Sequence, residues 1–280
     1  MDHPCDSETK VDQLLHSPSY RLAYTDIDFI MMPELRAARV ELEFLKPDLA
    51  LRREQISSTI VVFGGTRIVE PEAARRRLEA ARAALDESPK DRLRKRTVAQ
   101  AERLLARSKY YEVARRFGRI VGESCQVDGK CDYVVMTGGG PGIMEAANRG
   151  AFDVGAKSIG LNISLPLEQR PNPYVTPDLC FQFHYFAIRK FHFLLRAMAL
   201  VVFPGGFGTL DELFEVLTLR QTGHMQHIPV ILVGRDYWEN VINFQFLADE
   251  GTIADVDLEL FRYVETAEEA WEIIRKFHHI

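Results

Sequence analysis

The segment that sets the fold reads Ala199-Leu200-Val201-Val202-Phe203-Pro204-Gly205-Gly206-Phe207-Gly208-Thr209-Leu210-Asp211-Glu212. Its first five residues are apolar, and a run of that length is typical of a strand buried on both faces. A glycine-rich turn follows, and apolar residues then recur at helical spacing, at Leu210, Leu213, Phe214 and Leu217. Strand, turn and helix together predict a phosphate cradle. Glycines let backbone N–H groups approach an anion, and the helix N-terminus adds unpaired donors.

Further apolar runs with helical patterns between them predict the rest of a sheet. The predicted strands cover residues 59–63, 133–136, 158–163, 181–183, 199–203, 228–233 and 261–264. Strands that alternate with helices favour a mostly parallel sheet covered on both faces. The sequence therefore predicts an α/β fold, a Rossmann-like doubly wound sheet preceded by an N-terminal helical extension.

A chain of 280 residues is long enough for one large α/β domain or two small ones. We assign residues 1–58 to the helical extension, with the polar residues 1–17 expected to be disordered. Residues 59–280 are assigned to a single Rossmann-like nucleotide-binding domain. Within the extension, Pro33 is expected to open a helix and Pro47 to end it.

The composition is typical of a globular protein, with 46% hydrophobic and 27% charged residues. The net charge of −5 argues against binding of bulk nucleic acid. The four cysteines are scattered without zinc-ligand spacing, which favours reduced thiols. No apolar run reaches membrane-spanning length, and the N-terminus is acidic where a signal peptide is basic. We therefore expect a cytoplasmic protein without a membrane partner.

Residues 71–120 form a predicted helical region that breaks near Ser88-Pro89. The region holds fifteen lysines and arginines against seven acids, so its local charge is +8 (15 − 7) within a negative chain. A nucleic-acid surface has this pattern, and so has a solvated helix pair or a subunit interface. We favour the second interpretation and do not expect a nucleic-acid partner.

The glycine loops exclude two common nucleotide chemistries. A second loop, Gly138-Gly139-Gly140-Pro141-Gly142, follows the predicted strand at 133–136. Neither loop fits the GxGxxG/A fingerprint of dinucleotide folds, and no segment reads GxxxxGK[ST]. NAD and ATP chemistry are therefore not expected, and the two loops remain as a crevice for a phosphorylated ligand. The turn Gly64-Gly65-Thr66-Arg67 is either a further anion-facing turn or an ordinary strand exit.

Four charged residues call for a structural or a chemical reason. Arg189 and Lys190 lie in an apolar helix, and a buried arginine needs an anion, either an acid of the protein or a substrate. Glu212 lies one turn from the cradle, where a carboxylate can stabilise positive charge on a sugar ring. Alternatively, Glu212 forms a capping box with Thr209 and serves only its own helix. Glu145 likewise suits the first turn of its helix.

Three separated motifs in order resemble the Lonely Guy family. The segment from Pro204 to Glu212 resembles the family's PGGxGTxxE motif, and Arg189-Lys190 stands where the family has its Arg-Lys pair. The segment from Gly138 to Glu145 resembles the longer-chain branch. The resemblance covers roughly residues 60–233. The chain departs from the pattern in the N-terminal segment, in the basic helical region and at Gly64-Gly65-Thr66, where a serine is more usual after the first glycine.

Members of this family are cytokinin-activating phosphoribohydrolases, and relatives act on other purine nucleotides. The resemblance implies hydrolysis of the N-glycosidic bond of a nucleoside 5′-monophosphate, AMP or a cytokinin riboside monophosphate, to free base and ribose 5-phosphate. It implies that Arg189 and Glu212 are the catalytic pair. The substrate-binding residues to be expected are Gly139, Gly140, Glu168, Lys190, Gly205, Gly206, Gly208 and Thr209. No cofactor or metal is expected. A homo-oligomer, a dimer or larger, is expected.

Two other functions stay open. The molybdenum-cofactor carrier proteins are similar in fold and phosphate loop but hydrolyse nothing, and the presence of both Arg189 and Glu212 favours the enzyme. A protein resembling DNA-processing protein A would bind DNA with the basic helices at 71–120. A decarboxylase gains no support, because the sequence offers no lysine in a recognisable pyridoxal context.

Overall fold

The computed structural model describes residues 7–126, 131–165 and 170–280, and the chain divides into two compact units between Lys46 and Pro47. The first unit holds α1 (Ser7–Leu15), α2 (Ile27–Ile30) and the start of α3 (Arg36–Arg53), with 3-10 turns at Pro18–Tyr20 and Pro33–Leu35. None of its residues 9–46 is buried, so these helices have no core of their own. Helix α1 lies within residues 1–17, for which the composition predicts disorder.

The second unit begins inside α3, because the C-terminal half of that helix packs into the core of the sheet domain. Leu51 is 1% exposed and belongs with Ala50 to this core. The prediction that Pro47 ends the helix is wrong, since α3 continues to Arg53. Burial of these apolar residues offsets the hydrogen bond that a proline removes from a helix interior. The compact unit accordingly starts at Pro47, whereas the sequence predicts the domain from residue 59.

The second unit is built on a seven-stranded sheet in the order β4-β3-β2-β1-β5-β6-β7. Every neighbouring pair of strands is parallel. The strands are β1 (Thr59–Phe63), β2 (Val134–Thr137), β3 (Ser158–Ile163), β4 (Cys180–Phe183), β5 (Ala197–Val202), β6 (Val230–Val233) and β7 (Arg262–Val264). The predicted fold class, a Rossmann-like doubly wound parallel sheet, is confirmed.

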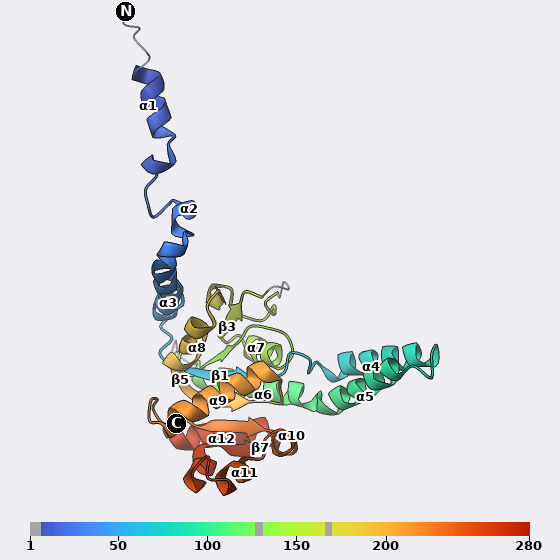
Figure 1. The fold of residues 1–280 in the computed structure, drawn as a ribbon. Coiled ribbons are helices and arrows are strands. Elements are labelled where there is room, and N and C mark those ends of the chain that lie inside the picture. The colour runs from blue at the N-terminus through green and yellow to red at the C-terminus, as the bar shows by residue number, and fades with distance from the viewer. Residues whose placement is uncertain (1–6, 127–130, 166–169) are drawn as a thin grey trace, which may run out of the picture. The chain divides into compact units, whose positions relative to one another are not determined.

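Helices cover both faces of this sheet (Figure 1). The helices of the second unit that follow α3 are α4 (Pro71–Asp86), α5 (Arg92–Arg107), α6 (Lys109–Cys125), α7 (Ile143–Asp153), α8 (Phe186–Leu195), α9 (Phe207–Gln221), α10 (Arg235–Val241), α11 (Phe244–Asp249) and α12 (Ala267–His278). Side chains alternate along β1: Ile60 and Val62 share a core with α6, α7 and α12, whereas Val61 and Phe63 share one with α8 and α9. No helix in the described part of the chain is long and apolar enough to cross a membrane.

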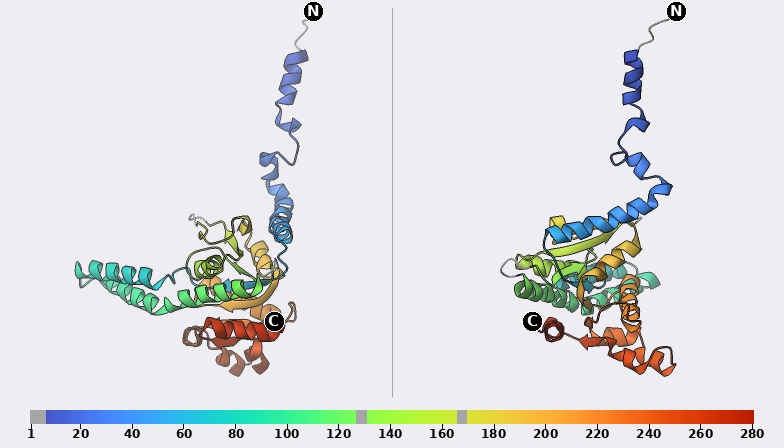
Figure 2. Two further views of the ribbon diagram at one scale, coloured as in Figure 1. Left: turned by 180° about the vertical axis from the view of Figure 1, so that it is seen from behind. Right: turned by 90° about the vertical axis from the view of Figure 1, so that its left-hand side faces the viewer.

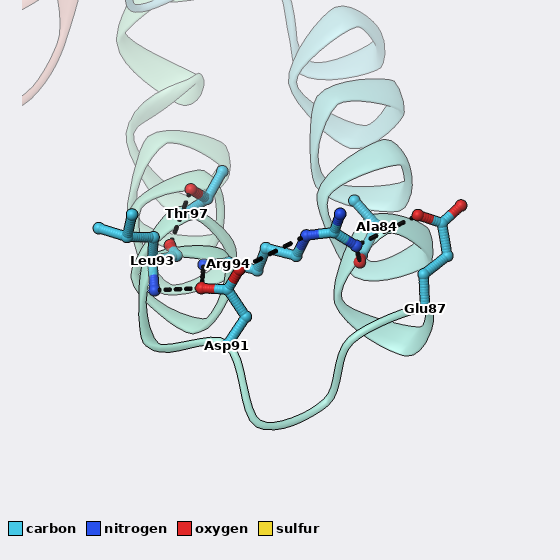
Figure 3. A network of polar contacts seen from close by, with 6 residues as sticks. All are labelled: Ala84, Glu87, Asp91, Leu93, Arg94 and Thr97. Atoms are coloured by element: carbon cyan, nitrogen blue, oxygen red, sulfur yellow. Dashed lines mark hydrogen bonds and ion pairs between the residues drawn. The ribbon is translucent and has the colours of Figure 1, made fainter.

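Helices α4 and α5 form a hairpin that extends away from the sheet (Figures 1 and 2). Its turn at residues 87–91 agrees with the predicted break in this basic region. Asp91 caps α5 by accepting a hydrogen bond from the N–H of Leu93 at 2.7 Å. Arg94 reaches back across the turn, where it pairs with Glu87 at 3.1 Å and donates to the Ala84 carbonyl of α4 (Figure 3). Part of the region's positive charge therefore stabilises the hairpin itself.

Replacing Gly150 by alanine is expected to destabilise the fold, because α7 packs against the backbone of α6 at that point. A Cβ at Gly150 would overlap the carbonyl oxygen of Arg115. Overpacking of this kind costs about 1–3 kcal/mol, which should lower the urea midpoint of unfolding. Gly208→Ala is the matched control, since a Cβ at that helical glycine meets nothing within 4 Å and alanine favours the helix. Equal midpoints for the two variants would contradict the close packing.

Candidate active site

The turn after β5 leaves main-chain donors free at the start of α9. The helix begins at Phe207, and its N-cap is Gly206, which has no side chain to cap it. Leu210 is the first residue whose N–H returns to the turn, where it bonds the carbonyl of Gly206 at 3.0 Å. Within the described chain, the N–H groups of Phe207, Gly208 and Thr209 have no acceptor, as is usual in the first turn of a helix. These donors and the positive end of the helix dipole form an anion-binding surface.

A cavity of about 240 Å³ opens beside this turn, at the carboxyl ends of β1 and β5. The two strands are neighbours, and the chain leaves them toward opposite edges of the sheet, which is where doubly wound folds bind ligands. The cavity is lined by Phe63, Gly64, Gly65, Thr66, Met144, Phe186, Arg189, Gly206, Gly208, Thr209, Asp211 and Glu212. Arg189 from α8 and Glu212 from α9 thus face the same space as the start of α9.

Glu212 is buried, at 6% exposure. Thr209 lies inside α9 and not at its N-cap, so the capping box considered for these two residues does not form. Among the described residues, none makes a hydrogen bond or an ion pair with the Glu212 carboxylate. Burial raises the pKa of Glu212 to about 7, although Arg189 and Lys190 act to lower it. At neutral pH the carboxyl group can therefore take either charge state, a property that is common at catalytic sites.

Arg189 supplies the opposite charge. Its Nε donates to the carbonyl of Leu161 at 2.7 Å. Burial lowers the pKa of Arg189, and the Glu212 carboxylate acts in the opposite direction. No acid in the described part of the chain lies within ion-pair distance of Arg189, so the internal salt bridge considered for it is not formed. Arg196, just after the same helix, does form one, with Asp48 at 2.6 Å.

The second glycine loop makes room for the Arg189 guanidinium. A Cβ at Gly138 would lie 2.6 Å from Nη2 of Arg189. Gly139 and Gly140, predicted to bind substrate, do not line the cavity. The Gly139 carbonyl accepts from the N–H of Asn172 at 2.8 Å, and the Gly140 carbonyl accepts from the side-chain amide of Asn172 at 3.1 Å. This loop therefore leaves space for the Arg189 guanidinium and holds Asn172 by hydrogen bonds.

Three of the predicted phosphate-binding residues, Gly206, Gly208 and Thr209, line the cavity. Gly205 does not; its carbonyl accepts a hydrogen bond from the hydroxyl of Tyr237 on α10. A Cβ at Gly205 would overlap the side chain of Thr209, so glycine is required there to seat the threonine.

Of the other two predicted substrate-binding residues, the structure describes only Lys190. Lys190 pairs with Asp211 at 2.8 Å and with Glu215 at 3.2 Å, and it is not part of the lining. Burial acts to lower the pKa of Lys190, but these carboxylates outweigh it and raise the pKa, so the amine stays charged and paired. Glu168 lies outside the described residues.

Sequence reasoning missed part of the cavity wall. Thr66 and the two glycines before it line the cavity, so the turn after β1, whose role the sequence leaves open, faces the same space. Met144 and Phe186 supply apolar surface. Phe186 is 52% exposed. The one feature of the sequence that indicates its place in the cavity is its position one turn before Arg189 in the same helix. Glu145 lies outside the lining and accepts from the Tyr111 hydroxyl at 3.0 Å.

The chain matches a family model described as possible lysine decarboxylase over residues 144–274. It is 28% identical over 156 residues to a probable cytokinin riboside 5′-monophosphate phosphoribohydrolase of Oryza sativa subsp. japonica, covering 51% of this chain and 68% of that protein. It is 30% identical over 140 residues to a cytokinin riboside 5′-monophosphate phosphoribohydrolase of Arabidopsis thaliana, covering 49% of this chain and 63% of that protein. The resemblance to the Lonely Guy family that the motifs predict is confirmed.

Among solved structures, the molybdenum cofactor carrier protein of Chlamydomonas reinhardtii superimposes with a TM-score of 0.49 at 17% identity, covering 80% of this chain and 99% of that one. The cavity does not have the residue that the decarboxylase activity in the family model's description would need. Pyridoxal chemistry needs a lysine amine for its Schiff base, and no lysine is part of the described lining.

Glu212→Gln is expected to stabilise the fold at alkaline pH, because it removes a buried carboxylate. The pKa of Glu212 rises from 4.5 to about 7 on folding, so the folded state favours the protonated form. The contribution of this group to stability is full below pH 4.5 and is lost as the pH rises through 7. We expect the free energy of unfolding of E212Q to exceed that of the wild type by about 3 kcal/mol at pH 8 and by less than about 1 kcal/mol at pH 5, as measured by urea unfolding.

Asp211→Asn is the control for this comparison. Asp211 is an exposed neighbour on the same helix and pairs with Lys190. Its loss should change the free energy of unfolding by less than about 1 kcal/mol at either pH. If E212Q were less stable than the wild type at pH 8, the folded chain would have to stabilise the ionised Glu212 carboxylate as well as water does.

Proposed function

We propose that this protein hydrolyses the N-glycosidic bond of a nucleoside 5′-monophosphate, of the AMP or cytokinin riboside monophosphate type, to free base and ribose 5-phosphate. One observation carries the proposal: Arg189 and Glu212 share a single cavity with the free N–H groups at the start of α9. An anion site beside a buried carboxylate suits a molecule that bears a phosphate at one end and develops positive charge at the other. The names of the two relatives support the same reaction class.

The start of α9 is the place for the 5′-phosphate. The N–H groups of Phe207, Gly208 and Thr209 are free to donate, and the Thr209 hydroxyl lies in the same lining. A Cβ at Gly206 or Gly208 would meet no protein atom within 4 Å, so the space over the turn is open to a ligand. A phosphate bound there places the attached ribose in the cavity that Glu212 lines.

Glu212 would stabilise the reacting sugar. The bond between C1′ and the base breaks with its electron pair leaving on the base, and positive charge develops on the ribose ring. The ionised Glu212 carboxylate opposes this charge in a water-poor site, where such an interaction is strong. Water then forms the new C1′–O bond and releases a proton, while the departing base gains one. Arg189 acts to lower the pKa of Glu212 and so favours the ionised form that this step needs.

The pH dependence of turnover should follow the ionisation of Glu212. Because the carboxylate is the working form and the pKa of Glu212 is about 7, kcat/KM for AMP should rise from pH 5 to pH 8 with a midpoint near neutrality. The measurement is release of adenine from AMP at constant ionic strength. A rate that instead increases as the pH falls would assign the protonated carboxyl group to the reaction and overturn the charge-stabilising role.

The direct test is a substrate panel of AMP, GMP, CMP and isopentenyl-AMP, with free base as the readout. We expect base release from at least one of them, and a loss of about a hundredfold or more in kcat for Glu212→Gln. The melting temperature of this variant at pH 7 should not fall. If Glu212 serves only its helix, E212Q should lose about 1 kcal/mol of stability and keep its activity.

Glu145→Gln is the matched control, since Glu145 also lies near the start of a helix behind a glycine loop but is outside the cavity. A glutamine there keeps an acceptor for the Tyr111 hydroxyl, so activity should be retained. Tight nucleotide binding without base release from any of the four substrates would leave a binding protein as the function.

A further inference from the structure

A second cavity, of about 340 Å³, lies beside the Gly205-Gly206 turn and excludes the proposed catalytic pair. It is lined by Gly65, Thr66, Arg67, Ile68, Leu104, Arg107, Pro204, Gly205, Gly206 and Tyr237. The residues that it shares with the first cavity are Gly65, Thr66 and Gly206. Neither Arg189 nor Glu212 belongs to its lining, so the turns after β1 and β5 form a common wall between two chemically distinct spaces.

The charge in this second cavity is all of one sign. Arg67 and Arg107 line it, and no acid does. Within the described chain neither arginine forms an ion pair. Some other arginines of the α4–α5 hairpin are paired, as Arg82 is with Glu102 at 2.8 Å and Arg94 is with Glu87 at 3.1 Å. Two guanidinium groups with no acid beside them at one cavity therefore favour an anionic ligand.

Arg107 is held at this cavity by its packing. Its guanidinium carbon lies 4.9 Å from the centre of the Tyr237 ring, and the Tyr237 hydroxyl in turn donates to the carbonyl of Gly205. Arg107 is thereby fixed relative to the glycine turn, which lowers the entropy lost when it binds a ligand. Arg67 follows directly on the turn after β1 and is exposed.

The rest of the lining is largely apolar. The side chains of Ile68, Leu104 and Pro204 and the ring of Tyr237 supply this surface. An inorganic anion would use only the arginines, whereas a ligand that joins an anion to a small apolar or aromatic group would also cover the apolar wall. Guanidinium groups match phosphate oxygens in bidentate geometry.

We propose that this cavity is a second ligand site, separate from the active site, for a small organic phosphate whose phosphate binds Arg67 and Arg107. Its organic part lies against Leu104, Ile68 and the Tyr237 ring. Its lining contains neither residue of the proposed catalytic pair, although it shares Gly65, Thr66 and Gly206 with the first cavity.

The test is calorimetric titration of the full chain with phenyl phosphate and, separately, with inorganic phosphate. We expect phenyl phosphate to bind more tightly, and both Arg67→Gln and Arg107→Gln to weaken its affinity at least tenfold. Arg103→Gln is the matched control: it removes the same charge one turn earlier on α5, from an exposed position outside the lining. Its affinity should stay within about twofold of the wild type.

Each other outcome overturns the site. No binding of phenyl phosphate to the wild type would do so, as would an equal loss in R103Q, which would indicate attraction by net charge alone. Equal affinities for inorganic phosphate and phenyl phosphate would show that the cavity does not recognise an organic group. Thr209→Val, which alters the first cavity only, shows where the probe binds: loss of binding in T209V with full binding in R67Q and R107Q would place it in the active site. Because no turnover is measured, the result does not depend on the hydrolase assignment.

Discussion

The turns after β1 and β5 are tied together by main-chain hydrogen bonds that continue the pairing of the two strands. The N–H of Phe203 donates to the carbonyl of Phe63 at 2.8 Å, and the N–H of Gly65 donates to the carbonyl of Pro204 at 2.9 Å. A Cβ at Gly65 would lie 3.1 Å from that carbonyl oxygen, so a residue with a side chain would crowd this approach. Both cavities take walls from these two turns. Their position on the sheet therefore depends on this contact.

The proposed active site keeps a buried carboxylate and a half-buried guanidinium near each other without pairing them. In the structural pair of Arg196 and Asp48, nitrogen and oxygen lie 2.6 Å apart and each charge is satisfied. Arg189 and Glu212 each shift the pKa of the other, but they form no ion pair. Burial of such groups is unfavourable, and a fold without a use for them would be more stable with neutral residues. Two charges left unpaired in this way are expected at a site where the ligand supplies the missing charged partner.

Local sequence patterns predicted the sheet well, because apolar runs of strand length are set by burial on both faces; each predicted strand end lies within two residues of the observed one. Where tertiary contacts decide, local signals failed. Pro47 remains inside a helix because that helix packs into a core. The spacing of Thr209 and Glu212 fits a capping box, yet the helix begins earlier, at the glycine turn. Sequence could not tell that Gly139 bonds a distant asparagine or that Lys190 has two acids as partners.

The two cavities differ in what charge they can accept. The first combines free N–H donors, a guanidinium and a carboxylate, so a simple anion bound there is attracted by the helix start but repelled by Glu212 when that group is ionised. A ligand gains fully only if it carries negative and positive charge at different ends, and a nucleotide does so only as its glycosidic bond breaks. The second cavity has arginines and no acid, so it gains from an anion in its ground state. On the proposed functions, this electrostatic difference means that the first cavity favours a transition state and the second favours a stable ligand.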